Sequence, residues 1–210
     1  MQIAIVLYDR FTALDAIGPY EMLCRTPGSE TVFVAERPGP VSNDRGTLTL
    51  LAEKALDEVP RPDIVVVPGG PGQRDQMGNE TLLGWLRAAA ATSTWTTSVC
   101  TGSLLLGAAG LLRGRRATSH WLALDTLATF GAEPTGERVV VDGKVVTGAG
   151  VSAGIDMALT LLGKVADDEF AQSIQLGTEY DPQPPYDAGS PLKAPAAVVG
   201  RLRDGTSVFR

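Results

Sequence analysis

The chain has 210 residues, of which 44% are hydrophobic and 20% are charged. This length and composition are sufficient for one domain with a full hydrophobic core. The net charge of -6 leaves no broad basic surface for phosphate groups, which argues against nucleic acid as a principal partner. We therefore predict a single domain over residues 1–210.

The N-terminal sequence and the cysteine content indicate a cellular compartment. Residues 1–8 resemble a buried strand and lack the regions of a signal peptide. No apolar run approaches the length of a membrane span. Two cysteines, Cys24 and Cys100, are too few for a disulfide framework. We expect a cytoplasmic protein without a membrane partner, in which Cys24 is a small core residue.

Apolar and β-branched runs predict the strands of a sheet. Residues 3–8 are apolar throughout, as expected for a strand covered on both faces. Similar runs follow at residues 31–35, 63–67, 95–99 and 115–119, and residues 41–51 favour a hairpin. Two more runs flank Asp142-Gly143, a dipeptide typical of a tight hairpin.

Helical segments alternate with these strands. Asn79 is a suitable cap for a helix through residues 85–91, and Pro19 is suited to opening an earlier helix. Further helices are predicted over residues 101–110, 122–130, 155–166, 168–177 and 196–202. The alternation predicts an α/β fold with a mostly parallel sheet, in which ligands bind at the carboxyl ends of the strands.

A proline-rich extension begins at about residue 180. Residues 181–191 favour neither helix nor strand. Their apolar and aromatic content predicts that they lie against the domain or against a partner subunit.

Cys100 stands where the strand over residues 95–99 turns into a helix. The first amides of a helix lack intrahelical partners and carry the positive end of the helix dipole, which favours a thiolate. The sequence therefore predicts that Cys100 is a nucleophile.

Asp15 is an isolated carboxylate in a mostly apolar segment. It is either a helix cap or a group whose pKa is raised for use, and the sequence leaves both alternatives open. A protonated carboxyl group can donate to a thiolate and later move a proton. We therefore expect Asp15, rather than the lone histidine His120, to pair with Cys100.

Two glycine-rich turns follow predicted strands, one at Gly69-Gly70 and one over residues 148–154. Glycines let backbone amides approach a ligand closely. These turns, Asp15, Cys100 and His120-Trp121 all follow strands, so we expect them to converge on one edge of the sheet. One histidine and two dispersed cysteines do not make the usual ligand set of a metal, and we expect neither a metal nor an organic cofactor.

Four motifs resemble the ThiJ/PfpI superfamily, and within it the isonitrile hydratases. They are Val67-Pro68-Gly69-Gly70, Ser98-Val99-Cys100-Thr101-Gly102, Ala117-Thr118-Ser119-His120-Trp121 and Thr147-Gly148-Ala149-Gly150-Val151-Ser152-Ala153-Gly154-Ile155-Asp156. The resemblance implies a flavodoxin-like three-layer sandwich, a cysteine nucleophile on a strained strand-to-helix elbow, and a homodimer. Protease-like and glyoxalase-like members commonly carry histidine directly after the cysteine, where this chain has Thr101.

The resemblance implies a cofactor-independent hydro-lyase that converts an isonitrile and water to an N-substituted formamide. We expect Cys100 to form a covalent thioimidate, Asp15 to move protons, and Thr101 to hold water or the carboxyl group. We further expect the amides near Gly70 and Val151 to bind developing charge. The substrate-binding residues predicted in this way are Gly69, Gly70, Trp121 and Val151.

Two alternatives remain open. The same domain resembles the amino-terminal part of AraC-type regulators, where it senses a ligand without catalysis, although this chain shows no helix-turn-helix region. A glyoxalase-like or redox-sensing protein would also use Cys100.

Overall fold

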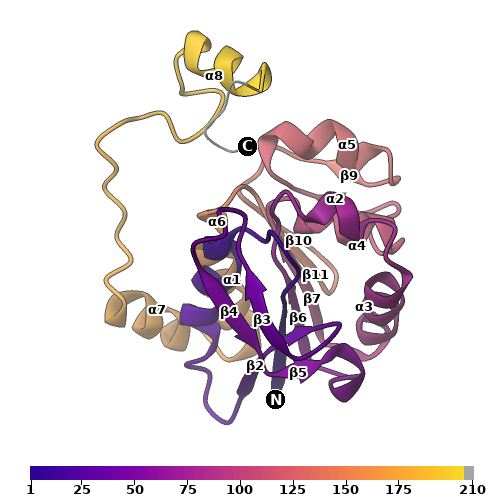
Figure 1. Ribbon diagram of the computed structural model, residues 1–210. Helices are drawn as coiled ribbons and strands as arrows, with labels where there is room; N and C mark the ends of the chain where they lie inside the picture. Colours follow the sequence, from indigo (N-terminus) through magenta and orange to yellow (C-terminus); the bar gives the residue numbers. More distant parts are fainter. Residues whose placement is uncertain (206–210) are drawn as a thin grey trace.

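The computed structural model describes residues 1–205 as a central sheet between layers of helices (Figure 1). The strands are β1 (Gln2–Val6), β2 (Glu30–Ala35), β3 (Gly39–Ser42), β4 (Thr49–Ala52), β5 (Lys54–Ala55), β6 (Ile64–Val67), β7 (Trp95–Val99), β8 (Arg116–Ala117), β9 (Glu133–Pro134), β10 (Val139–Asp142) and β11 (Val145–Gly148). The α-helices are α1 (Ala13–Leu23), α2 (Gln73–Gln76), α3 (Glu80–Thr92), α4 (Gly102–Ala108), α5 (Leu124–Ala128), α6 (Ala153–Val165), α7 (Asp168–Gly177) and α8 (Ala196–Arg203). Two 3-10 helices are η1 (Leu56–Glu58) and η2 (Trp121–Ala123).

The central sheet has seven strands in the order β10-β11-β7-β6-β1-β2-β5. Its neighbouring strands are parallel except for β10 and β11, which form the predicted antiparallel hairpin at one edge. The order places the carboxyl ends of β1, β6, β7 and β11 side by side. The prediction of an α/β fold with a mostly parallel sheet is confirmed.

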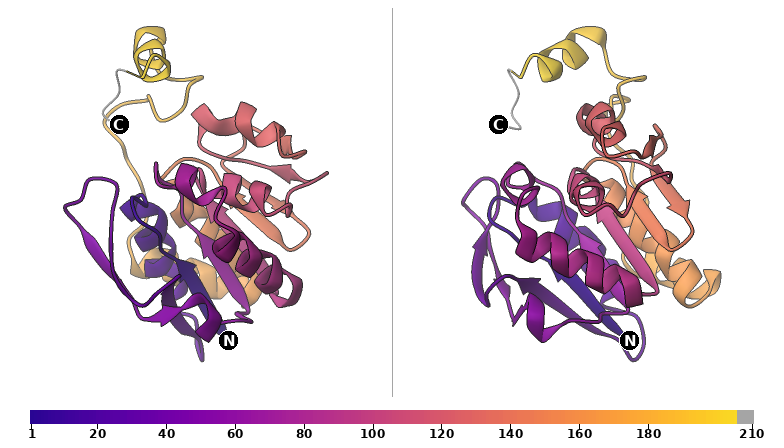
Figure 2. Two further views of the ribbon diagram at one scale, coloured as in Figure 1. Left: turned by 45° about the vertical axis from the view of Figure 1, so that its right-hand side comes forward. Right: turned by 90° about the vertical axis from the view of Figure 1, so that its right-hand side faces the viewer.

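Helices cover both faces of the sheet. Figure 1 shows α1, α6 and α7 on one side and α3 and α4 on the other, and the turned views of Figure 2 agree. The central strands are correspondingly apolar on both faces, and Ile3, Ile5 and Ile64 are fully buried. These layers form the predicted three-layer sandwich.

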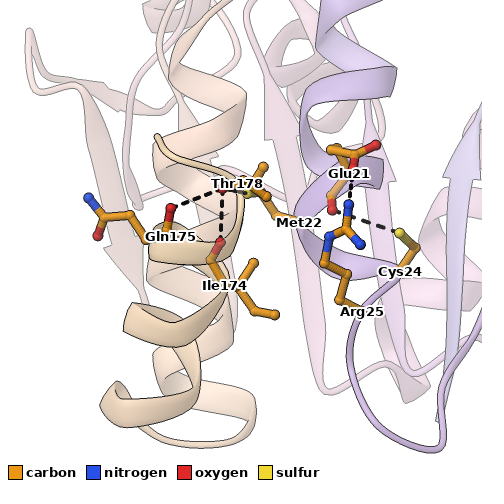
Figure 3. A network of polar contacts seen from close by, with 7 residues as sticks. All are labelled: Glu21, Met22, Cys24, Arg25, Ile174, Gln175 and Thr178. Atoms are coloured by element: carbon orange, nitrogen blue, oxygen red, sulfur yellow. Dashed lines mark hydrogen bonds and ion pairs between the residues drawn. The ribbon is translucent and has the colours of Figure 1, made fainter. Parts of the chain in front are cut away.

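Helix α7 lies beside α1 in the helical layer that α1, α6 and α7 form, as Figure 3 shows. The Thr178 hydroxyl donates to the Ile174 carbonyl at 2.9 Å and lies 4.0 Å from the Met22 sulfur of α1. Cys24 is the C-cap residue of α1, and its sulfur lies 3.8 Å from the Glu21 carbonyl oxygen. Cys24 is only partly buried, so the prediction that it is a core residue is wrong.

Two local predictions also need correction. The run at residues 115–119 contributes only β8, which pairs with β9 in a separate small sheet. Its two arginines do not suit a strand that is covered on both faces. Pro19 lies inside α1 rather than at its start, and there it removes the hydrogen bond that its amide would donate to the Asp15 carbonyl.

The proline-rich segment extends away from the sheet before α8 begins (Figures 1 and 2). Residues 181–189 are exposed, and the side chains of Tyr186 and Leu192 are 78% and 98% exposed. The expectation that this segment packs on its own domain is therefore wrong, because its prolines and polar residues hold it in an extended form off the surface. Packing against a partner subunit stays a prediction.

The longest helices within residues 1–205 are α3 and α6, with 13 residues each. A membrane span needs about 20 apolar residues, and no helix in this part of the chain qualifies.

Candidate active site

The backbone of Cys100 forms a strained elbow between β7 and α4. Its φ angle of 57° lies in the left-handed region, which a residue other than glycine rarely adopts. The Cys100 amide donates to the carbonyls of Gly148 and Ala149 at 3.0 and 2.9 Å. Its carbonyl accepts from the hydroxyls of Ser103 and Ser119 at 3.1 and 3.0 Å. Contacts from three segments therefore hold the elbow that the resemblance implied.

Asp15 lies in the first turn of α1, but it is not the cap. The N-cap residue is Thr12. The Asp15 side chain is fully buried and turns toward the next strand end, where its Oδ2 accepts from the Gly69 amide at 3.0 Å. A Cβ atom at Gly69 would lie 2.7 Å from the Thr101 hydroxyl oxygen and 2.9 Å from Asp15 Oδ2. Only glycine fits between these two groups.

The carboxyl group of Asp15 contacts the Cys100 thiol. Burial raises the pKa of Asp15 to about 7, against the lowering effects of the Gly69 amide and of the contact with Cys100, and the charge of Asp44 raises it further. Asp15 Oδ1 is buried and has no regular hydrogen-bond partner within residues 1–205. The alternative that Asp15 is a helix cap is therefore wrong. Its raised pKa agrees with the other alternative, and its use in catalysis stays a prediction.

The contact with Asp15 also affects the pKa of the Cys100 thiol. Burial and then the charge of Asp15 raise the pKa of Cys100, whereas the amides of Val151 and Thr101 lower it. The predicted effect of the helix start is therefore outweighed. When Asp15 is protonated, its repulsion of a thiolate disappears, but burial is the larger cause and still raises the pKa of the Cys100 thiol. Asp15, with the lower pKa, therefore loses its proton before the thiol does.

Thr101 is placed by the neighbouring glycine loop. Its hydroxyl oxygen accepts from the Gly70 amide at 3.0 Å, so these two groups satisfy each other. The Gly70 φ angle is 134°, and a Cβ atom there would lie 2.5 Å from the Thr12 amide nitrogen. Thr101 and Gly70 therefore join the two loops beside Cys100.

A cavity of about 290 Å³ opens onto the cysteine. Its lining includes the predicted residues Gly70, Cys100, Thr101 and Val151, together with His120. The predicted convergence on one edge of the sheet is therefore observed for these segments. Among the described residues, Gly69 does not line the cavity, although it was predicted to bind substrate.

Trp121 does not line this cavity in the part of the chain that the structure describes. Its ring lies 5.7 Å from the Arg203 guanidinium of α8 and 6.0 Å from the His120 ring. His120 Nδ1 accepts from the Leu122 amide at 3.3 Å and so caps η2. Burial lowers the pKa of His120, which keeps the ring neutral near pH 7. Within residues 1–205, no hydrogen bond joins His120 to Cys100, which favours a structural role.

Several site residues were not predicted. The buried Tyr8 hydroxyl donates to the Pro68 carbonyl at 2.7 Å, and Asp44 accepts from the Thr12 hydroxyl at 3.1 Å at the cavity wall. Gln73 also lines the cavity. It is 4% exposed, and its Nε2 has no partner among the described residues. The only signal for Gln73 was its position directly after the Gly69 to Gly72 turn.

No group of three or more histidine, cysteine, aspartate or glutamate side chains able to hold a metal occurs within residues 1–205.

Comparison with known proteins matches residues 1–164 to the DJ-1/PfpI family. The chain belongs to the DJ-1/PfpI family. An isonitrile hydratase from Pseudomonas putida is 45% identical over 203 residues, which cover 97% of this chain and 89% of that protein. The crystal structure of a ThiJ/PfpI family protein from Pseudomonas syringae has a TM-score of 0.95 at 39% identity, covering 99% of this chain and 86% of that chain. A helix-turn-helix transcriptional regulator from Pseudomonas aeruginosa is 31% identical over 65% of this chain and 40% of the regulator.

The pKa of Asp15 predicts a pH-dependent stability. Its pKa of about 7 in the folded chain lies above the ordinary aspartate value of 3.8, so the folded chain holds an additional proton between these pH values. The stability that this proton provides is fully present below about pH 4 and is lost as the pH rises through 7, by up to about 4 kcal/mol. Asp15→Asn removes this dependence. The free energy of unfolding of the variant, minus that of wild type, should therefore become more positive as the pH rises from 5 to 7.5. Urea unfolding at several pH values measures this difference. The exposed Asp57→Asn variant should follow wild type, and a constant difference for Asp15→Asn would contradict the assignment.

Proposed function

We propose that this member of the DJ-1/PfpI family is an isonitrile hydratase, which adds water to an isonitrile and releases an N-substituted formamide. The observation that carries the proposal is the contact between the buried Asp15 carboxyl group and the Cys100 thiol beside a cavity. The 45% identity to an isonitrile hydratase over 97% of the chain supports it.

The first step joins the substrate to the enzyme. The Asp15 carboxylate takes the proton of the Cys100 thiol, and the thiolate attacks the terminal isonitrile carbon and forms a C–S bond. One π pair of the carbon–nitrogen bond moves to nitrogen, and the lone pair of the carbon takes the proton of the Asp15 carboxyl group. The product is a thioimidate, in which sulfur, hydrogen and the doubly bonded nitrogen share one carbon, and Asp15 is left as a carboxylate.

Water completes the reaction. As its oxygen bonds to the thioimidate carbon, the Asp15 carboxylate takes a proton from the water and passes it to the nitrogen. The tetrahedral adduct then collapses: the C–S bond breaks, its electrons return to sulfur, and the hydroxyl proton moves to Asp15. The cycle thus restores the thiolate and the protonated carboxyl group without an oxidant or reductant.

The backbone around Cys100 stabilises the charged states. The amides of Val151 and Thr101 hydrogen-bond to the sulfur and favour its negative charge before attack and after release. The Gly70 amide is engaged by the Thr101 hydroxyl, so we assign Thr101 to the fixing of the glycine loop rather than to the direct binding of water. Gly69 keeps Asp15 in place through its amide.

The cavity suits a small, weakly polar substrate. Part of its wall is apolar, formed by Met77, Leu104, Leu122 and Ala123. We therefore place the N-substituent against these side chains, with the isonitrile carbon at Cys100. Trp121 has no part in this arrangement, since its ring packs near Arg203 instead.

We also propose that the protein works as a cytoplasmic homodimer. Both cysteines are free thiols, and a reducing compartment keeps a nucleophilic cysteine active. The exposed Tyr186 and Leu192 on the proline-rich segment offer apolar surface to a second copy.

Light scattering on the purified protein should therefore give twice the chain mass of 22.0 kDa. The double variant Tyr186→Ser, Leu192→Ser should shift the mass toward that of the monomer. A monomeric wild-type protein at micromolar concentration would contradict the proposed dimer.

The activity itself is tested by mixing the purified protein with alkyl and aryl isonitriles and following formamide formation. Cys100→Ala should abolish turnover, whereas Cys24→Ser should retain it, because Cys24 lies at the end of α1 outside the cavity. Asp15→Asn should lower kcat/KM by at least about 100-fold, the usual contribution of a proton-transfer group. Thr101→Val removes the acceptor of the Gly70 amide and should lower it by about 10-fold.

Methylglyoxal serves as the competing substrate in the same assay. Consumption of methylglyoxal without isonitrile turnover would support the glyoxalase-like alternative and contradict the proposal. Full turnover by Cys100→Ala would exclude the covalent route.

A further inference from the structure

The loop over residues 148–152 supports the nucleophile at two points. The carbonyls of Gly148 and Ala149 accept the Cys100 amide, and the Val151 amide hydrogen-bonds to the Cys100 sulfur. Val151 itself has a φ angle of 27°, which is strained for a β-branched residue. A strained loop keeps such a geometry only when its surroundings hold it in place.

Arg138, just before β10, contacts this loop from both ends. Its backbone carbonyl accepts from the Ala149 amide at 2.9 Å. Its guanidinium Nη2 donates to the Ser152 hydroxyl at 3.2 Å, and its Nε donates to Asp156 Oδ2 at 2.8 Å. The Nη2 of Arg138 also lies 2.6 Å from Asp156 Oδ2. One residue therefore joins the start of the loop to the first turn of α6.

The contact extends to the end of α7. The Tyr180 hydroxyl donates to Asp156 Oδ2 at 3.1 Å, so Tyr180 and Arg138 share this oxygen. The side chains of Arg138 and Asp156 are 49% and 32% exposed. Exposed ion pairs contribute little to global stability, so stability alone does not account for this arrangement around the loop.

We propose that Arg138 is a positioning residue for the nucleophile, which fixes the loop over residues 148–152 so that the Val151 amide stays on the Cys100 sulfur. The proposal deepens the proposed hydratase function and rests on it for the effect on turnover. Its effect on the thiol is independent of the substrate.

The geometry requires arginine rather than any cation. The guanidinium presents Nε and Nη2 in a fixed planar fork, which reaches Asp156 and Ser152 at the same time. A lysine ammonium is a single point charge and can keep the ion pair with Asp156 without fixing both contacts. Arg138→Lys keeps the positive charge but loses the fixed pair of contacts, so it tests the effect of positioning separately from the effect of charge.

The test is the pH dependence of Cys100 alkylation by iodoacetamide, followed on the Cys100 peptide by mass spectrometry. In Arg138→Met the pH midpoint should rise by about one unit, since a hydrogen bond to a charged group shifts a pKa by roughly that amount. Arg138→Lys should show a smaller rise in the same direction. With isonitrile, Arg138→Met should lower kcat by about 10-fold with little change in KM.

Arg87→Met is the matched control, because Arg87 is 45% exposed and pairs with Glu80 on the surface of α3. It should leave the alkylation midpoint and turnover at wild-type values. An unchanged alkylation midpoint in Arg138→Met, with only a lower urea midpoint, would overturn the positioning role. If Arg138→Met fails to fold, an unshifted midpoint in Arg138→Lys overturns it equally. A shifted midpoint without isonitrile turnover in the wild type would instead contradict the proposed function alone.

Discussion

The contact between Asp15 and Cys100 is the interaction on which the site depends. Both groups are acids, both are buried, and a double negative charge in such a place is strongly unfavourable. Burial and mutual repulsion therefore raise the pKa of both groups, so each keeps its proton to a higher pH than an isolated group would. The amides of Val151 and Thr101 hydrogen-bond to the sulfur and oppose this effect at the thiol. Asp15 loses its proton first, and its carboxylate is then placed to take the proton of the thiol.

The fold places this pair at the carboxyl ends of neighbouring parallel strands. Segments that follow β1, β6, β7 and β11 meet there, because the sheet order sets these strands side by side. Glycines allow the close approach: a Cβ atom at Gly102 would lie 2.1 Å from the Val67 carbonyl oxygen. Hydrogen bonds to the carbonyls of residues 148 and 149 and from two serine hydroxyls then hold the strained backbone of Cys100. Packing and backbone contacts thus hold the thiol at the cavity.

The elbow was predictable from local sequence. A β-favouring run that stops at Cys100 and a glycine-rich start to the next helix determine the conformation over a few residues, and the position of Gly69-Gly70 follows from the same kind of pattern. The pairing with Asp15 was also expected from its isolated charge. Its location inside α1 was not, because Thr12 caps the helix without a side-chain hydrogen bond and Pro19 lies where a helix interior is seldom expected.

The remaining differences arise from contacts between distant segments. Trp121 was expected in the cavity, but Arg203 of α8 lies near its ring, a contact between residues far apart in the chain. Asp44 and Gln73 line the cavity because the loop of the β3–β4 hairpin and the start of α2 both lie beside it, which no local pattern indicates. Ser119 supports Cys100 although β8 lies outside the central sheet. Local patterns therefore located the reacting groups, and tertiary contacts determined what surrounds them.

The central claim concerns the protons of this pair, which spectroscopy observes directly. Infrared difference spectra between wild type and Asp15→Asn, recorded from about pH 4 to about pH 9, report the protonation of Asp15, and ultraviolet thiolate absorbance that Cys100→Ala removes reports the sulfur. The account predicts that the carbonyl band of protonated Asp15 is lost through about pH 7, while the sulfur shows no thiolate absorbance at that pH. Loss of the carbonyl band already near pH 4, or thiolate absorbance at about pH 7, would contradict it.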